Sequence, residues 1–468
     1  MGGRVERDSM GSVKIPEGKL WGAQTQRAID NFPISGIPFH PEFIDALAGI
    51  KLAAARANTD LSVIPAETAN WIVRACHRVL EGTLHDQFPL DIFQTGSGTS
   101  TNMNMNEVLA NLAIGFAGGV VGSRTPVHPN DHVNASQSSN DVIPTALHVA
   151  SVRLLTRKLI PALRQLKQAL DGKAAQFDRI VKTGRTHLQD ATPIRLGQEF
   201  GGYARQVERA IERAEAAADT LRELPLGGTA VGSGINRHPE FPIRAIGYLN
   251  EMDSEHYREA VNHFEANAAR DSAVEASGMI RTIAVSLSKV ANDIRWMGSG
   301  PRNGLGELRL PAVQPGSSIM PGKVNPVIPE ALLMVCAHVI GSDLAVTLGG
   351  LGSIFELNLM MPLIAHHLIG SIRYLADAIT VFTERCVLGL AAEVDRIRSL
   401  TERSLMIATA LAPIIGYDRA ADISKRAYET GRTVREVVLE MNLIPPEQLE
   451  AALDLHTLTE PGLASTGD

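Results

Sequence analysis

The 468-residue sequence predicts an all-α fold in which long helices pack into a central bundle. Apolar residues recur at alternating spacings of three and four over two long stretches, and the strict alternation typical of strands is nearly absent. Aromatic residues make up only 4% of the chain, so the core must be aliphatic, and alanine-rich stretches such as Ala53–Ala57 let helices approach closely. Because uncharged seams of this length commonly need partner helices, we expect the bundle to assemble into a multi-subunit helical core.

Changes in pattern along the chain predict three domains. They are an N-terminal mainly helical domain, a central long-helix bundle and a small C-terminal helical domain, over residues 1–135, 136–392 and 393–468. In the first domain we expect helices near Pro41–Thr59 and Ala66–Glu81, followed by polar loops.

Two apolar seams define the central domain. The first runs through Leu155, Leu159, Leu163, Leu166 and Leu170. The second follows the heptad rule through Ala276, Ile280, Ile283, Leu287, Val290, Ile294 and Met297. The shorter helices of the C-terminal domain are separated at Ile415–Asp418 and Pro445-Pro446, where glycine and proline interrupt the helical pattern.

Charge and composition exclude several classes of protein. The formal net charge is −7 with both signs interspersed, which offers no basic face for nucleic acid. No apolar run approaches the roughly 18 residues of a membrane span, and the first residues lack an apolar signal core, so we expect a cytoplasmic protein without a membrane partner. Cys76, Cys336 and Cys386 are far apart within apolar helical patterns, which is typical of free buried thiols. We expect no metal and no cofactor.

Gly316–Glu330 is the stretch most informative about function. Its glycines, prolines, adjacent hydroxyls and single lysine predict an ordered loop that leads into a helix, with Asn325 as the N-cap and Pro326 at the first helical position. The following residues, Ala331–Ala337, are apolar on every side, which predicts a buried helix. Hydroxyls, free amides and Lys323 at the positive end of a helix dipole suit a carboxylate.

Two other interpretations apply to a loop of this composition. A phosphate loop is excluded by spacing, because five residues separate Gly316 from Gly322 and Val324 stands where a magnesium-binding hydroxyl is needed. A capped interdomain turn with its lysine in water remains open when the loop is considered alone.

Three further polar clusters interrupt the helices. They cover Gln94–Glu107, Ser136–Asp141 and Gly184–Asp190. Each is rich in small donors that can bind carboxylate oxygens, and each could alone be a capped helix start or, at His187, a structural histidine. Metal-ligand spacings, a nucleophile elbow and a dinucleotide-binding pattern are missing, and the glycines of Leu226–Gly234 follow no strand, so they indicate a nucleotide loop only weakly.

Taken together and in order, these segments resemble the aspartase and fumarase superfamily. Gly316–Glu330 is similar to its signature loop, and further matching segments lie at Thr95–Asn102, His128–Asp141, Gly184–Asp190, Gly227–Gly234 and Phe355–Asn358. Within the superfamily the chain is similar to class II fumarases. Aspartases typically have Gln in place of His187, Thr in place of Ser139 and Pro-Ala-Lys in place of Pro321–Lys323.

The resemblance implies a cofactor-free hydro-lyase of the tricarboxylic acid cycle. It would interconvert fumarate and L-malate by anti addition of water through an aci-carboxylate intermediate. The implied architecture is an all-α, three-domain homotetramer in which three chains build each active site. Aspartate ammonia-lyase activity and a catalytically silent helical scaffold are the alternatives that the sequence leaves open.

By the same resemblance Ser317 is the base, and His187 handles the hydroxyl that leaves C2, with Glu330 as its orienting partner. The residues implied to bind substrate oxygens are Ser97, Gly98, Thr99, Ser138, Ser139, Asn140, Thr186, Ser318, Lys323 and Asn325.

A secondary dicarboxylate site is implied at His128, Pro129, Asn130 and Asp131. Relatives often carry consecutive basic residues just before this segment, whereas this chain has Arg124–Val127. Occupancy of the site and a simple capped surface turn therefore both remain open.

Overall fold

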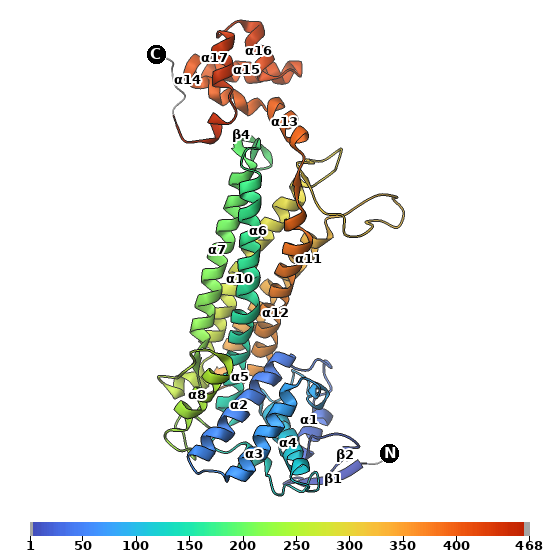
Figure 1. The fold of residues 1–468 in the computed structure, drawn as a ribbon, viewed down its shortest axis with the longest axis vertical. Helices are drawn as coiled ribbons and strands as arrows, with labels where there is room; N and C mark the ends of the chain where they lie inside the picture. The colour runs from blue at the N-terminus through green and yellow to red at the C-terminus, as the bar shows by residue number, and fades with distance from the viewer. Residues whose placement is uncertain (1–2, 463–468) are drawn as a thin grey trace. The chain divides into compact units, whose positions relative to one another are not determined.

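The computed structural model describes residues 3–462, and this part of the chain is mainly helical, as predicted (Figure 1). It divides into two compact units that each combine distant pieces of sequence. Unit 1 comprises Met1–Pro161, Glu212–Val285 and Val335–Asp377; unit 2 comprises Ala162–Ile211, Ser286–Met334 and Ala378–Asp468. These units follow packing, whereas the predicted domains follow the chain, so the division at residues 135 and 392 stays a prediction.

Unit 1 begins with an antiparallel hairpin, β1 (Gly3–Asp8) and β2 (Gly11–Pro16), in which Gly3 lies opposite Pro16. Its helices are α1 (Ala23–Asn31), α2 (Pro41–Asp60), α3 (Ala66–Leu80), α4 (Thr99–Phe116), α5 (Ser139–Leu154), α8 (Phe241–Asp253) and α9 (His263–Ala268). Helix α2 packs against α3, α5 and α8, and its alanines are at most 4% exposed, so the close approach expected from composition is confirmed. The helices predicted near Pro41–Thr59 and Ala66–Glu81 are likewise confirmed.

Long helices carry the two predicted seams. They are α6 (Ile160–Gln176), α7 (Leu196–Leu221), α10 (Asp271–Met297), α11 (Val327–Gly350) and α12 (Met361–Arg385), and each of them contributes residues to both units. Every member of the Ala276–Met297 heptad series is at most 3% exposed, and the leucines of the first seam are fully buried, with a π-helical turn, η3 (Leu155–Leu159), between α5 and α6.

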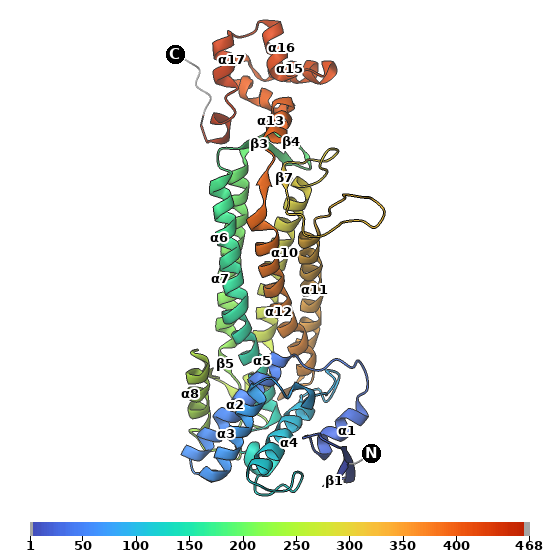
Figure 2. The ribbon, with the colours of Figure 1, turned by 45° about the vertical axis from the view of Figure 1, so that its right-hand side comes forward.

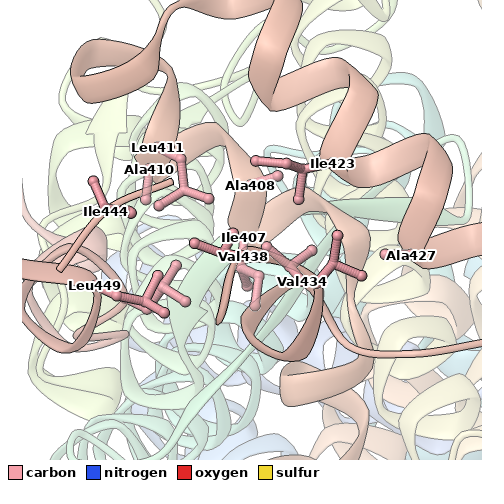
Figure 3. Packing of buried hydrophobic residues seen from close by; sticks show 12 residues of the cluster. Ile407, Ala408, Ala410, Leu411, Ile423, Ala427, Val434, Val438, Ile444 and Leu449 are labelled. Atoms are coloured by element: carbon pink, nitrogen blue, oxygen red, sulfur yellow. The ribbon is translucent and has the colours of Figure 1, made fainter. Parts of the chain in front are cut away.

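Unit 2 contains the hairpin β3 (Val181–Thr186) and β4 (Gln189–Arg195), which α13 (Val394–Arg403) contacts, as Figure 2 shows. The C-terminal helices are α14 (Ala412–Ile415), α15 (Tyr417–Thr430), α16 (Val434–Met441) and α17 (Pro446–Ala452). They surround a small aliphatic core that includes Leu411, Ile423, Val438 and Leu449 (Figure 3). The predicted breaks are confirmed, since Gly416 separates α14 from α15 and Pro445 precedes α17.

The remaining strands are two residues long. Three pairs occur among the described residues: β5 (Glu223–Leu224) with β6 (Arg258–Glu259), β7 (Leu308–Arg309) with β10 (Ala391–Ala392), and β8 (Ser353–Ile354) with β9 (Leu357–Asn358).

Helix α11 corrects two expectations. Over its best 18-residue window the mean hydropathy is 1.9, so this helix is long and apolar enough to cross a membrane, contrary to the prediction that no such run exists. Only 33% of that window is buried, so α11 is not the enclosed helix that its composition suggested. Core helices of soluble proteins pass the same test of length and composition, and one such helix is weak evidence for a membrane span.

Candidate active site

The first two polar clusters form the N-terminal ends of α4 and α5 in unit 1. Gly98 is the N-cap of α4 in the left-handed region, with φ of 70°, and a Cβ there would lie 2.8 Å from the Ile143 side chain. A Cβ on Gly96 would lie 1.9 Å from the Leu359 carbonyl oxygen. Glycine is therefore required at both positions, because the chain turns sharply against α5 and the segment before α12.

A chain of hydroxyls joins these two helix starts. Ser97 Oγ and Thr99 Oγ1 are 2.7 Å apart, and Thr99 Oγ1 and Ser139 Oγ are 2.8 Å apart. Ser139 Oγ donates to Asn140 Oδ1 at 3.4 Å. The structure thus brings together predicted site residues that lie about forty positions apart in the sequence, beside the positive ends of two helix dipoles.

The buried carboxylate of Asp141 stabilises the start of α5. Ser138 and Asp141 form a capping box at the start of α5, and Asp141 Oδ2 accepts hydrogen bonds from the amides of Gly227 and Thr229 at 3.0 and 2.9 Å. Burial raises the pKa of Asp141, and the amide donors oppose that rise. The glycine-rich stretch 226–234 therefore supports the start of α5. The two-residue strand β5 (Glu223–Leu224) precedes this stretch, so the expectation that it follows no strand is wrong, but its amides bind the Asp141 carboxylate of the same chain.

The Ser317 loop lies in unit 2. Ser317 Oγ accepts hydrogen bonds from the amides of Ile319 and Met320 at 3.2 and 2.9 Å. The loop is closed at its base, where the Gly316 amide donates to the Lys323 carbonyl oxygen at 2.7 Å and Asn325 Nδ2 donates to the Gly316 carbonyl oxygen at 2.7 Å. Two amides aimed at one hydroxyl oxygen favour negative charge on that oxygen.

Asn325 corrects a detail of the sequence analysis. Helix α11 begins at Val327, and the Asn325 side chain closes the loop instead of capping the helix. Ser318 and Lys323 are exposed, and within residues 3–462 neither side chain forms a hydrogen bond inside the chain.

His187 occupies the tip of the β3–β4 hairpin. His187 and Leu188 form a two-residue turn with φ of 56° and 60°, which is the geometry of a type I′ turn. The sequence analysis treated Gly184–Asp190 as a polar segment between helices, but Val181–Thr186 and Gln189–Arg195 are strands and α7 begins at Leu196. Thr186 and His187 are exposed, and among the described residues no hydrogen bond or ion pair joins His187 to half-buried Glu330 in one chain.

The predicted site residues therefore fall into two groups. One group, in unit 1, is Ser97, Gly98, Thr99, Ser138, Ser139 and Asn140. The other, in unit 2, is Thr186, His187, Ser317, Ser318, Lys323, Asn325 and Glu330.

Two family profiles match this chain. The sequence profile described as lyase matches residues 11–341, and the profile described as the fumarase C C-terminus matches residues 407–460. Fumarate hydratase class II of Halobacterium salinarum is 53% identical over 99% of both chains, and that of Thermosynechococcus vestitus is 51% identical over 97% of both. The chain belongs to the class II fumarate hydratase family. The resemblance found in the sequence is confirmed.

Solved structures of the family agree. The class II fumarase from Schistosoma mansoni is 37% identical with a TM-score of 0.93, covering 98% of this chain and 99% of that one. A fumarate lyase:delta crystallin from Brucella melitensis bound to cobalt is 44% identical with a TM-score of 0.94, covering 98% of this chain and 100% of that one. Within residues 3–462 of this family member, no group of three or more His, Cys, Asp or Glu side chains is arranged to hold a metal ion.

The segment implied as a secondary site forms a single π-helical turn, η2 (Pro129–Val133). His128 Nδ1 accepts hydrogen bonds from the amides of Asn130 and Asp131, both at 3.2 Å, while Pro129 is buried and Asp131 is exposed. The turn is capped by its own histidine. Its occupancy by a dicarboxylate stays a prediction.

Sequence analysis missed the buried groups behind the hydroxyls. Asn134 Oδ1 accepts hydrogen bonds from Lys51 Nζ at 3.0 Å and from the Asn102 and Asn106 amides at 3.1 Å each. Lys51 is fully buried, and burial lowers its pKa to about 7. A lysine within the alanine-rich run of α2 was the signal available, since lysine is almost never buried without a partner.

Proposed function

We propose that this chain catalyses the reversible hydration of fumarate to L-malate. The observation that carries the proposal is the Ser317 turn, in which two main-chain amides point at a hydroxyl oxygen, within a chain whose full-length relatives are named fumarate hydratases. In the direction of dehydration the Ser317 alkoxide takes the proton from C3 of malate, and the electron pair moves into the adjacent carboxylate to give the aci-carboxylate.

The barrier to this step is chiefly electrostatic, because the substrate is already a dianion. Oriented donors in a dry site lower such a barrier, and each is worth about 10²–10³ in rate. The amides of Ile319 and Met320 would stabilise the alkoxide, and Lys323 and Asn325 would hold the carboxylate that gains charge. His187 then donates a proton to the C2 hydroxyl, which leaves as water, and the double bond of fumarate forms.

The hydroxyl chain of Ser97, Thr99 and Ser139 suits the other carboxylate. Its members are neutral donors beside two helix N-termini, so they bind an anion without adding counter-charge. Neutral donors would leave the substrate free to depart once the reaction is complete.

We also propose a homotetramer whose sites each take residues from three chains. Support comes from α11, where Ile340, Leu344 and Leu348 lie four residues apart and are 39%, 61% and 52% exposed. An apolar stripe of this kind favours burial against another helix. We further propose that the chain is a cytoplasmic enzyme of the tricarboxylic acid cycle, because the proposed reaction interconverts fumarate and L-malate.

An ultraviolet assay of the conjugated double bond tests the reaction. We expect absorbance to rise when the purified chain is given L-malate and to stay flat with L-aspartate. Ser317→Ala should lower turnover by at least about 10²-fold with helix content unchanged, whereas Ser9→Ala, at an exposed turn, serves as the matched control.

Signal from aspartate alone would show an ammonia-lyase. No signal from either acid would favour a silent scaffold.

A further inference from the structure

The tip of the β3–β4 hairpin rests on a buried ion pair that the proposed chemistry does not use. Arg185 Nη1 donates to Glu307 Oε2 at 3.0 Å, and Arg185 Nη2 donates to Glu307 Oε1 at 2.8 Å. The Glu307 side chain is completely buried, and that of Arg185 is 16% exposed. Paired parallel bonds between a guanidinium and a carboxylate fix both distance and orientation.

Glu307 is itself held rigidly. Its amide donates to the Met297 carbonyl oxygen at the end of α10 at 2.8 Å, and its own carbonyl oxygen accepts from the Glu393 amide at 2.9 Å. Lys182 Nζ lies 3.2 Å from Glu307 Oε2 and donates to Glu199 Oε2 at 2.7 Å, so two cations and two anions balance. The position of the Glu307 carboxylate is therefore fixed, and its hydrogen bonds fix the position of the Arg185 guanidinium.

Beyond Arg185 few interactions hold the hairpin in place. The last residue pairs are Arg185 with Asp190 and Thr186 with Gln189, and residues 186–190 are all exposed. Within residues 3–462 the side chains of this tip form no hydrogen bond inside the chain. A strand irregularity between Thr183 and Arg185 leaves the tip more dependent on what holds Arg185.

We propose that Arg185 is the positioning residue for His187, and that its paired hydrogen bonds to Glu307 fix the turn that presents the imidazole to substrate. The inference rests on the proposed fumarate hydratase reaction, because the imidazole must meet the C2 hydroxyl at hydrogen-bond distance. Misplacement of a reacting group by about 1 Å can lower a rate about 10²-fold.

A kinetic cycle distinguishes positioning from general stabilisation. Arg185→Met should lower kcat about 10²-fold and change KM by less than about threefold, since most of the predicted carboxylate donors lie elsewhere. In a His187→Asn background the same change should cost less than about threefold in kcat, because the group that Arg185 positions is already missing. Equal losses in both backgrounds, or no loss in the parent, would overturn the proposal.

Arg195→Met is the matched control. Arg195 lies at the other end of the same hairpin and bonds to Asp178 at 3.0 Å and to Glu460, but it is far from the turn. It should leave kcat within about twofold of the parent. If Arg185→Met fails to fold, Arg185→Lys keeps the charge and loses only the paired geometry, and should lower kcat in the same cycle.

Hydrogen exchange decides the inference without reference to activity. Amides of residues 186–190 should exchange faster in Arg185→Met and remain unchanged in Arg195→Met. If the parent does not act on malate, the proposed function fails, while unchanged exchange at the turn in Arg185→Met would refute the positioning role by itself.

Discussion

Burial sets the charge of several single residues in unit 1. His148 on α5 donates from Nδ1 to the Glu223 carbonyl oxygen at 2.8 Å and is 4% exposed. Burial, with a smaller contribution from the Arg270 charge, lowers its pKa from 6.5 to about 4. The imidazole is therefore neutral at physiological pH and accepts a proton only at a cost to the fold.

Acid should destabilise the protein through this residue. The unfolded chain binds the proton near pH 6.5 and the folded chain only near 4, so stability that is complete above pH 6.5 is lost as the pH falls through this window. We expect a loss of about 2 kcal/mol in the free energy of unfolding between about pH 7.5 and 5, measured by urea unfolding at one protein concentration.

His148→Gln should remove that part of the pH dependence, while His456→Gln, at an exposed position, should retain it. An unchanged pH dependence in His148→Gln would show that other groups dominate, for example His40, His366 and His367, whose pKa values burial also lowers.

Single residues were predictable from sequence where one short segment carried the chemistry. Ser317 and His187 stand in distinctive short segments, and the resemblance of those segments to the family's motifs was enough to nominate them. Asp141 and Glu307 were not nominated, because their partners lie 86 and 122 positions away and only the fold brings them together.

At the scale of elements, the start of α4 shows how glycine shapes the candidate site. Gly98→Ala places a side chain in the left-handed region and against Ile143, so we expect a loss of about 1–3 kcal/mol in unfolding free energy and a higher KM for fumarate. Thermal unfolding and steady-state kinetics measure the two effects.

Substitution of Gly115, inside the same helix, should change the free energy of unfolding in the opposite direction. A Cβ there meets nothing within 4 Å, so Gly115→Ala should stabilise the fold by about 0.5–1 kcal/mol with KM unchanged. If both substitutions had the same effect, the special geometry at Gly98 would be irrelevant.

Helices were more predictable than hairpins. The Ala276–Met297 series follows a heptad pattern that does not depend on which helix packs against it, and the series is buried as expected. The β3–β4 hairpin was missed because its turn is formed by His187 and Leu188, not by the Asn-Gly or Asp-Gly pairs that usually mark a type I′ turn.

At the scale of the whole molecule, the exposed apolar stripe on α11 is the surface that the proposed assembly would bury. The sequence analysis inferred partner helices from the long uncharged seams, but both seams are buried within the chain, and the exposed apolar surface lies on α11. Composition alone could not show which apolar face remains outside after one chain has folded.

Leu344→Glu should split the assembly. A carboxylate in the middle of the α11 stripe would be buried without a partner, so we expect a smaller mass by sedimentation and loss of turnover. Val63→Glu, at a 44% exposed position in the turn after α2, should change neither. Full turnover from a verified Leu344→Glu monomer would contradict shared sites.

The three cysteines have a consequence for oxidative stress. All are buried, and burial raises the pKa of Cys76 and of Cys386 to about 12. Peroxide attacks thiolates, whereas these two sulfurs stay protonated and enclosed. Both thiols should therefore stay reduced when the folded chain is exposed to peroxide, because the packing of the helices shields them.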